Sequence, residues 1–278
     1  MICFPNAKIN IGLKVIEKRS DGYHNTESIF YPISLSDVLE FSERDKTSGR
    51  GISLVTTGIN IDSPVEENLV FLAAELLRKE YSLPPLDIHL HKLIPTGSGL
   101  GGGSSDAAFS LRSLNYYFNI GITEEKLLKM AYVLGSDCPF FIKNSSAFIS
   151  GRGEKFQRIE LDLSRFHLVV VYPDIHIDTG TAYSRVIPAK PDIPVHELIK
   201  HPVRQWRKSI TNDFEKPVFS EFPQIKSIKE KLYQMGAVYS SLTGSGSAVY
   251  GLFDKKTETA GQFGNYTVWQ EKLKKKQA

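Results

Sequence analysis

The sequence is poor in cysteine, since Cys3 and Cys138 are the two present in 278 residues. Two cysteines outside any CxxC pair exclude a disulfide framework and a thiolate zinc site, and they are typical of a reducing compartment. Long apolar runs are also missing, because the run 168–172 is far below the roughly 20 residues that span a bilayer. The opening MICFPNAKIN lacks the basic and apolar regions of an export signal. We therefore expect a cytoplasmic protein without a membrane partner.

An excess of charge of one sign is absent as well. Lys plus Arg number 34 and Asp plus Glu 31, and four of the lysines stand in the tail 272–276. Without that tail the net charge is slightly negative, so no basic surface for nucleic acid is expected. The tail itself, which lies within a helix-like segment over 268–276, is interpreted as a solvated helix end or a frayed terminus. No repeat at a fixed period is visible, which excludes solenoids and propellers.

The patterning that is present predicts a mixed fold. Alternating apolar and polar residues predict strands within 7–15, 29–33 and 88–94, with a turn at Asp21-Gly22. Helical spacing predicts helices over 66–80, 105–118, 123–134 and 222–235. Strands over 167–172, 237–241 and 248–253 follow the turn at 151–153. We expect an α+β protein of two lobes, residues 1–156 and 157–278, rather than an alternating βαβ array.

The most informative stretch is 95–108, PTGSGLGGGSSDAA. Five glycines within seven residues cost backbone entropy on ordering, so the stretch needs a physical reason. Close approach to an anion supplies one, because successive N–H groups and the start of a helix bind phosphate. The alternative is a flexible turn in which Ser104 caps the helix. We predict a phosphate-binding loop made of Pro95, Thr96, Gly97, Ser98, Gly99, Leu100, Gly101, Gly102, Gly103, Ser104 and Ser105.

Other phosphate-binding motifs match this stretch less well. Gly97, Gly99 and Gly102 satisfy GxGxxG, but the strand-ending acid that an NAD-binding oxidoreductase needs about twenty residues further on is missing. A Walker A loop requires a lysine where this chain has Gly103. The HRD and DFG signatures of protein kinases are absent.

Three segments in the same order along the chain resemble the motifs of the GHMP kinases. The stretch 95–108 is similar to the second motif, PNAKINIGL at 5–13 to the first, and LTGSGSAVYG at 242–251 to the third. The resemblance covers residues 5–253. It implies a two-lobed GHMP kinase fold, with an N-terminal lobe like domain 2 of ribosomal protein S5 and a C-terminal α/β sandwich lobe. It also implies ATP as co-substrate and Mg²⁺, for which Ser105 is the candidate ligand.

Two further segments are similar to one branch of that superfamily. These are Asp21-Gly22-Tyr23-His24 and GSDCPFF at 135–141. The branch phosphorylates the 2-hydroxyl of a small acceptor that carries cytidine diphosphate, in non-mevalonate isoprenoid precursor synthesis. A mevalonate- or homoserine-type kinase would have no use for a stacking Tyr23. A nucleotide-binding protein without catalysis is the remaining alternative, against which the presence of Lys8, Asp137 and Ser105 argues.

The resemblance implies two catalytic residues. Asp137 would be the base that takes the proton of the acceptor hydroxyl, whereas by sequence alone an Asp before Pro139 indicates a loop cap. Lys8 would point at this acid and at the acceptor oxygen, although one lysine in an alternating strand is usually solvated. We therefore expect a small-molecule kinase, acting as a monomer or a homodimer.

The resemblance also implies an acceptor pocket. Tyr23 would stack on the cytosine, His24 would read its polar edge, and Asn10 would lie near the hydroxyls on the strand face that carries Lys8. Thr179 and Tyr183 match a second wall by spacing. The alternatives are an exposed aromatic and histidine after a turn and a strand-end asparagine.

Two residues stay open between a binding and a structural role. Arg152 lies in a glycine turn where relatives carry lysine or a neutral residue, so a diphosphate contact and a surface arginine are both possible. Asn68 resembles a residue near the adenosine, and a helix-start asparagine explains it equally well.

Overall fold

The computed structural model describes residues 1–44 and 51–275. Its contacts divide the chain into two compact units, each assembled from three stretches. Unit 1 comprises Met1–Ala7, Leu35–Thr96 and Gly101–Asn144; unit 2 comprises Lys8–Ser34, Gly97–Leu100 and Ser145–Ala278. The glycine-rich loop thus contributes Gly97–Leu100 to unit 2 and its remainder to unit 1. The division into lobes 1–156 and 157–278 stays a prediction.

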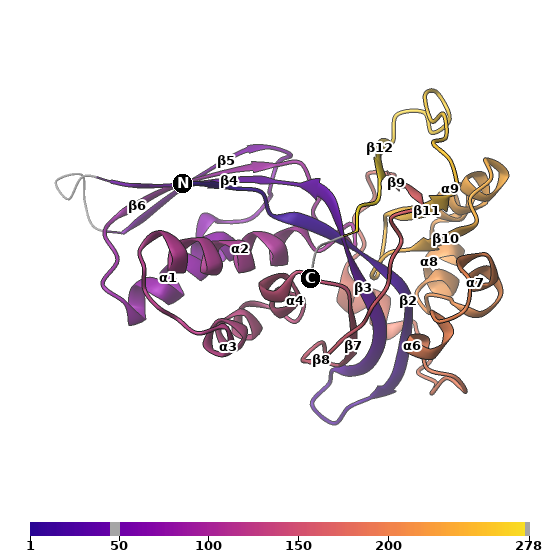
Figure 1. Cartoon of the computed structure of the whole chain (residues 1–278), viewed down its shortest axis with the longest axis horizontal. Coiled ribbons are helices and arrows are strands. Elements are labelled where there is room, and N and C mark those ends of the chain that lie inside the picture. The colour runs from indigo at the N-terminus through magenta and orange to yellow at the C-terminus, as the bar shows by residue number, and fades with distance from the viewer. Residues whose placement is uncertain (45–50, 276–278) are drawn as a thin grey trace. The chain divides into compact units, whose positions relative to one another are not determined.

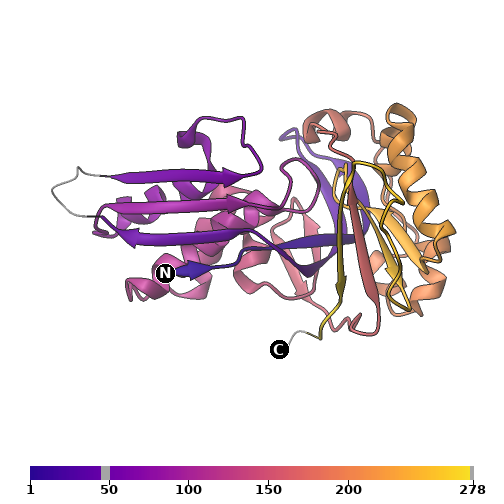
Figure 2. The same cartoon turned by 90° about the horizontal axis from the view of Figure 1, so that it is seen from above.

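Unit 1 contains a sheet in the order β1-β4-β6-β5. Its strands are β1 (Ile2–Cys3), β4 (Val38–Glu43), β6 (Leu86–Lys92) and β5 (Ile52–Gly58). Apolar residues alternate along β6, so Leu86, Ile88 and Leu90 point into the core. β5 and β6 are parallel and the neighbouring pairs antiparallel, and Figure 2 shows these strands side by side. This mixed sheet belongs to the predicted α+β class.

Four helices of unit 1 gather on one face of that sheet (Figure 1). They are α1 (Leu69–Glu80), α2 (Gly102–Tyr117), α3 (Glu124–Leu134) and α4 (Cys138–Lys143). Asn68 and Thr123 cap α1 and α3 with side-chain oxygens, which confirms the predicted cap of α3 and the structural role of Asn68. α2 begins three residues before the prediction, because Gly101 at φ +75° ends the loop there. α4 was not predicted, since its six residues show no helical period.

Unit 2 contains an antiparallel sheet in the order β10-β11-β9-β12. Its strands are β9 (His167–Tyr172), β10 (Tyr239–Leu242), β11 (Val249–Phe253) and β12 (Thr267–Lys272). The predicted strands at 167–172, 237–241 and 248–253 are confirmed, with small shifts at their ends. The helix expected over 268–276 is wrong, because residues 267–272 form the strand β12. This strand pairs with β9 in an antiparallel register that places Val268 opposite Val171 and Gln270 opposite Val169. Lys276 lies outside the described residues.

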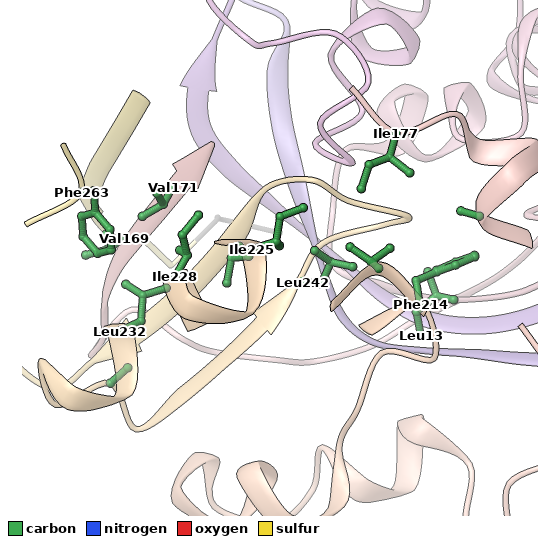
Figure 3. Close-up of a cluster of buried hydrophobic side chains, with 14 of the residues drawn as sticks. Leu13, Val169, Val171, Ile177, Phe214, Ile225, Ile228, Leu232, Leu242 and Phe263 are labelled. Carbon is green, nitrogen blue, oxygen red and sulfur yellow. The ribbon is translucent and has the colours of Figure 1, made fainter. Parts of the chain in front are cut away.

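Helix α9 (Pro223–Gln234) packs against β10 and β11 and confirms the helix predicted over 222–235. Figure 3 shows the hydrophobic core beneath it, where Ile225, Ile228 and Leu232 from α9 meet Val169 and Val171 from β9. The same cluster extends to Phe214 and to Leu13, which lies in β2 (Asn6–Lys18), a strand of a second sheet. The two sheets therefore share one core. The other helices are α5 (Thr179–Ser184), α6 (Val195–Leu198), α7 (Val203–Ser209) and α8 (Glu215–Glu221).

A second sheet, in the order β2-β3-β7-β8, carries the first motif. Its strands are β2 (Asn6–Lys18), β3 (His24–Ser36), β7 (Ala147–Gly151) and β8 (Lys155–Arg158). The predicted turn at Asp21-Gly22 joins β2 to β3, with Gly22 at φ +84°. Thr26 of β3 pairs with Gly151 of β7. This register places the turn that contains Tyr23 beside the turn that follows β7. No helix in the described part of the chain is long and apolar enough to cross a membrane.

Candidate active site

Two glycines of the loop have a packing reason that sequence reasoning missed. Gly97 and Gly99 have φ of +64° and +79°, a region that favours glycine. A Cβ on Gly97 would stand 2.2 Å from Nδ1 of His176, and one on Gly99 would stand 2.0 Å from the carbonyl oxygen of Thr243. These two glycines are therefore required by close packing within unit 2, whether or not a phosphate binds.

The three motifs meet at this packing contact. The Ala248 N–H donates to the carbonyl of Ser98 at 3.0 Å, and the Thr243 hydroxyl donates to the carbonyl of Gly99 at 3.0 Å. From the first motif, the Lys8 N–H donates to the carbonyl of Leu100 at 2.9 Å. The loop is thus hydrogen-bonded to two segments that lie far from it in the sequence, one at Lys8 and one within 243–248.

Gly102 and Gly103 occupy the first turn of α2, after the N-cap Gly101. The alternative in which Ser104 caps the helix is wrong, because Ser104 lies inside that turn. A Cβ on Gly102 would stand 2.8 Å from Cγ2 of Ile94, so packing explains this glycine too. A Cβ on Gly103 would meet Cδ1 of Leu69 at 3.7 Å, an ordinary contact, and the residue is exposed.

Gly101 is explained by its φ of +75°, so Gly103 is the loop glycine whose missing side chain neither packing nor backbone conformation explains. Its N–H belongs to the first turn of a sixteen-residue helix, where N–H groups lack intrahelical partners and the dipole favours an anion. Exposure is uneven elsewhere in the loop: Thr96 is exposed, whereas Ser98 and Leu100 are buried. A phosphate would reach main-chain groups here rather than most of the side chains.

Ser105, the candidate magnesium ligand, has a side chain without exposed surface. Its hydroxyl has no hydrogen-bond partner among residues 1–44 and 51–275. A ligand of Mg²⁺ has to reach the ion, so coordination would require this hydroxyl to become accessible, and its role as magnesium ligand stays a prediction. The described residues also hold no group of three His, Cys, Asp or Glu side chains that could form a metal site by themselves.

Lys8 is enclosed in β2 with 2% of its surface exposed. Its ammonium donates to Oδ1 of Asn10 and, at 3.0 Å, to the carbonyl of Gly99, and it lies 4.6 Å from the centroid of the Phe30 ring. The alternative of a solvated lysine is therefore wrong. Burying an ammonium is costly unless it is compensated, and here polar atoms and an aromatic face compensate it.

Asn10 connects Lys8 to the third motif. Its Oδ1 also accepts the Gly244 N–H at 2.9 Å and lies 3.2 Å from the Thr243 hydroxyl oxygen, while its Nδ2 donates to Ser28 at 2.9 Å. The residue is 1% exposed. Its amide is engaged at both ends within the protein, which fixes the Lys8 ammonium; a contact of Asn10 with the acceptor stays a prediction.

Asp137 precedes α4 at the N-cap position and is half-buried. Within the described part of the chain, its carboxylate makes no capping bond to that helix, so the loop-cap interpretation is not supported. The next residue, Cys138, faces the Ser104 hydroxyl of α2. Burial raises the pKa of the Cys138 thiol to about 12, and the charge of Asp137 acts in the same direction. Asp137 thus stands at the contact between the starts of α2 and α4.

A buried charge cluster beneath the loop was not predicted from the sequence. The Lys92 ammonium donates to Oδ2 of Asp37 at 2.5 Å and to Oδ2 of Asp106 at 2.8 Å. Oδ1 of Asp37 accepts the N–H groups of Leu93 and Ile94 at 2.5 and 2.8 Å. Burial raises the pKa of Asp106 well above its usual range, although the Lys92 ammonium acts in the opposite direction.

This cluster holds both ends of the loop within unit 1. Asp37 fixes the chain leaving β6, and Asp106 belongs to α2, which the loop enters. A Cβ on Gly102 would lie 3.1 Å from the Lys92 ammonium, so the cluster lies directly under the first turn of α2. The position of the Gly103 N–H therefore depends on these three buried side chains.

The predicted acceptor residues lie in unit 2. Tyr23 is 55% exposed, and the Arg152 guanidinium lies 3.5 Å from its ring centroid. The His24 ring stacks on Tyr183, with centroids 4.9 Å apart and planes 18° apart, and burial lowers the pKa of His24. The Thr179 hydroxyl lies 3.2 Å from that of Ser245, in the third motif. Two residues predicted from separate segments, His24 and Tyr183, are thus brought into contact.

Sequence reasoning missed the residues that hold these groups. Asn212 donates from Nδ2 to the carbonyls of Leu242 and Gly244 at 3.0 and 2.8 Å and so shapes the third motif. The Tyr250 hydroxyl donates to the carbonyl of Asn10 at 2.8 Å. The glycine pattern of the third motif gave a signal for Tyr250, which lies within it, but no local pattern marks Asn212.

Comparison with known families assigns both halves of the chain to one class. The model of the GHMP kinases N terminal domain matches residues 68–145, and that of the GHMP kinases C terminal domain matches residues 195–263. The first match contains the loop and Asp137, and the second contains the third motif. These matches define the chain as an ATP-dependent small-molecule kinase of the GHMP class.

Full-length relatives narrow this class. The 4-diphosphocytidyl-2-C-methyl-D-erythritol kinase of Parabacteroides distasonis is 46% identical over 98% of this chain and 100% of its own length. That of Bacteroides fragilis is 49% identical over 91% of this chain and 92% of its own. The chain therefore belongs to the 4-diphosphocytidyl-2-C-methyl-D-erythritol kinase family.

Solved structures agree with this assignment. A crystal structure of 4-(cytidine 5'-diphospho)-2C-methyl-D-erythritol kinase matches with a TM-score of 0.76 at 33% identity, covering 91% of this chain and 90% of that one. The Methanococcus jannaschii mevalonate kinase matches with a TM-score of 0.68 at 15% identity, covering 97% of each chain. The second likeness concerns the fold alone.

Proposed function

We propose that this chain transfers the γ-phosphoryl group of ATP to the 2-hydroxyl of 4-diphosphocytidyl-2-C-methyl-D-erythritol, with Asp137 as base and Lys8 as electrostatic partner. The reaction belongs to non-mevalonate isoprenoid precursor synthesis. The observation that carries the proposed site is the contact of Cys138, next to Asp137, with Ser104 in the first turn of α2. This contact supports a site in which the Asp137 carboxylate lies close to the main-chain groups proposed to hold the triphosphate.

The proposed phosphate site is formed by the main chain of the loop 95–105. In-line phosphoryl transfer depends mainly on positioning and on neutralising charge. Backbone N–H groups at the start of α2 would bind the phosphate oxygens, and the buried Lys92 cluster would keep them in place. Mg²⁺ enters as part of the MgATP co-substrate, and no step is assigned to Ser105.

The proposed proton acceptor is the Asp137 carboxylate. As the 2-hydroxyl oxygen forms its bond to the γ-phosphorus, its proton passes to Asp137 and the bond to the bridging oxygen of ADP breaks. ADP leaves with the electron pair of that bond.

The proposed role of Lys8 is electrostatic. Its ammonium is held by the Asn10 side chain and the Gly99 carbonyl, so it does not need to reorganise during the reaction. A fixed positive charge in a site of low polarity stabilises negative charge that develops on the acceptor oxygen. Asn10 acts in this proposal by positioning Lys8, in addition to its predicted place near the hydroxyls.

The proposed base pocket is formed by Tyr23, His24, Thr179 and Tyr183. An exposed ring such as Tyr23 offers a face for stacking on cytosine, which is worth about 1–3 kcal/mol and tolerates many bases. Selectivity for cytosine would then come from hydrogen bonds to its polar edge, for which His24 is the candidate. Stacking on Tyr183 fixes the ring plane of His24.

Membership of this family favours a cytidine-linked acceptor over the mevalonate- and homoserine-type alternatives and over an inactive nucleotide-binding protein. The proposal includes two lobes that divide near residue 156, and a cytoplasmic enzyme that acts on small molecules as a monomer or a homodimer. No nucleic-acid or membrane partner is proposed.

A panel of acceptors tests the proposed reaction. MgATP is supplied with 4-diphosphocytidyl-2-C-methyl-D-erythritol, mevalonate or homoserine, or without acceptor, and ADP release is measured. We expect ADP with the cytidine-linked acceptor alone, and a new phosphomonoester on carbon 2 in the ³¹P NMR spectrum of the product. Faster ADP release with mevalonate or homoserine, or phosphate on another hydroxyl, would contradict the proposal.

A further inference from the structure

The aromatic ring proposed to bind the base is itself covered on one face. The Arg152 guanidinium lies 3.5 Å from the centroid of the Tyr23 ring, the separation of a stacked pair. A ring has two faces, so a guanidinium on one leaves the other for a ligand. Tyr23 is 55% exposed, so a large part of its surface is accessible to a ligand.

Arg152 is itself held in place. Its guanidinium lies 3.9 Å from Oδ2 of Asp21, which accepts hydrogen bonds from Arg19 at 3.0 and 3.1 Å. Oδ1 of Asp21 accepts the Tyr23 N–H at 3.2 Å. A single carboxylate thus connects the backbone of Tyr23 to the cation that covers its ring.

The strand register makes this contact possible. β3 pairs with β7 so that Thr26 stands opposite Gly151, the residue before Arg152. The Arg152 N–H donates to Oε2 of Glu154 at 2.5 Å, and Gly151 adopts a φ of +71° that turns the chain back. The turn after β7 therefore presents Arg152 to the turn that precedes β3.

We infer that Arg152 is a positioning residue for the acceptor: it stacks on Tyr23 and holds the ring in the orientation that receives the cytosine. This inference rests on the proposed function of Tyr23. An exposed tyrosine loses rotamer freedom when a ligand stacks on it, and a ring that is already ordered loses less. Arg152 therefore increases affinity for the acceptor without entering the chemical step.

The test is the kinetics of Arg152→Ala with the cytidine-linked acceptor. We expect the KM for the acceptor to rise about three- to tenfold, while kcat and the KM for ATP stay within about twofold of wild type. Arg152→Lys keeps the charge but not the planar group, so it should resemble Arg152→Ala. Arg207→Ala is the matched control, since Arg207 also lies over a tyrosine, 4.0 Å from the Tyr233 ring. An unchanged acceptor KM in Arg152→Ala would overturn the inference.

A double-mutant cycle separates this inference from the proposed function. Tyr23→Ala should raise the acceptor KM, and Arg152→Ala should then add nothing in the Tyr23→Ala background. If Tyr23→Ala leaves the KM unchanged, the proposed base pocket is wrong. If Tyr23→Ala raises the KM and Arg152→Ala still adds its own effect, Arg152 contacts the ligand directly and the positioning role is wrong.

Discussion

Replacing Asp137 by asparagine is expected to lower kcat by about 10²–10⁴-fold, the usual contribution of a general base. Asparagine keeps the size of the side chain but does not accept the proton of the acceptor hydroxyl. Asparagine has nearly the same shape as aspartate, and the cap of α4 does not use the Asp137 side chain, so we expect the fold to be retained. Steady-state kinetics with the cytidine-linked acceptor measure kcat and both KM values, and thermal unfolding measures stability.

Asp87→Asn is the control for this prediction. Asp87 lies in β6 of the same unit, and its side chain is half-exposed beside Arg44 at 3.7 Å. Removing a surface carboxylate there should leave kcat unchanged. Turnover near the wild-type value in Asp137→Asn, with the control also normal, would exclude Asp137 as the base.

Replacing Lys8 by methionine is expected to lower kcat by about 10²–10³-fold, with a much smaller change in the acceptor KM. The ammonium acts in the transition state, where negative charge develops, more than in the bound ground state. Methionine fills the space beside Phe30 and keeps the enclosed strand packed, so lost volume does not account for the effect.

Lys14→Met is the matched control, since Lys14 lies on the same strand and pairs with Asp213 at 2.7 Å at a partly exposed position. This variant should retain its turnover and lose at most about 1 kcal/mol of stability. If Lys8→Met raised the acceptor KM and left kcat unchanged, Lys8 would bind the acceptor rather than stabilise the transition state.

Local signals predicted much of the fold. Alternation predicted β2, β3 and β6, a short apolar run predicted β9, and helical spacing predicted α1, α2, α3 and α9. Elements such as α1 and β6 have one buried face, which leaves a clear period in the sequence. α4 and β12 were missed or misassigned, because α4 is almost wholly buried and β12 depends on pairing with β9 rather than on its own pattern.

Prediction of the candidate site was likewise limited to residues grouped in local segments. Motif resemblance selected Lys8, Asp137 and the glycine loop, because these residues are grouped in short segments. The cluster of Lys92 with Asp37 and Asp106 was missed, since Asp37 and Lys92 are 55 positions apart and each alone indicates a surface charge. Contacts between distant segments decide such clusters, and a local pattern does not record them.

The structure corrects the reason that the sequence argument gave for the glycines of the loop. Their number was taken to indicate approach to a phosphate, yet Gly97 and Gly99 are explained by packing on His176 and Thr243. Gly102 is explained by Ile94 in the same way. The argument for phosphate binding therefore depends on the open first turn of α2 at Gly103 rather than on how many glycines precede it.

The affinity of Gly103→Ala for MgATP is the most direct test of the claim that the main chain here holds the triphosphate. The free protein has room for the methyl group beside Leu69, and alanine should stabilise α2 by up to about 1 kcal/mol. If phosphate lies against this turn, the methyl group displaces it and the KM for ATP rises about tenfold or more, as expected for loss of one charged hydrogen bond. A stable Gly103→Ala protein with wild-type affinity for ATP would contradict the account.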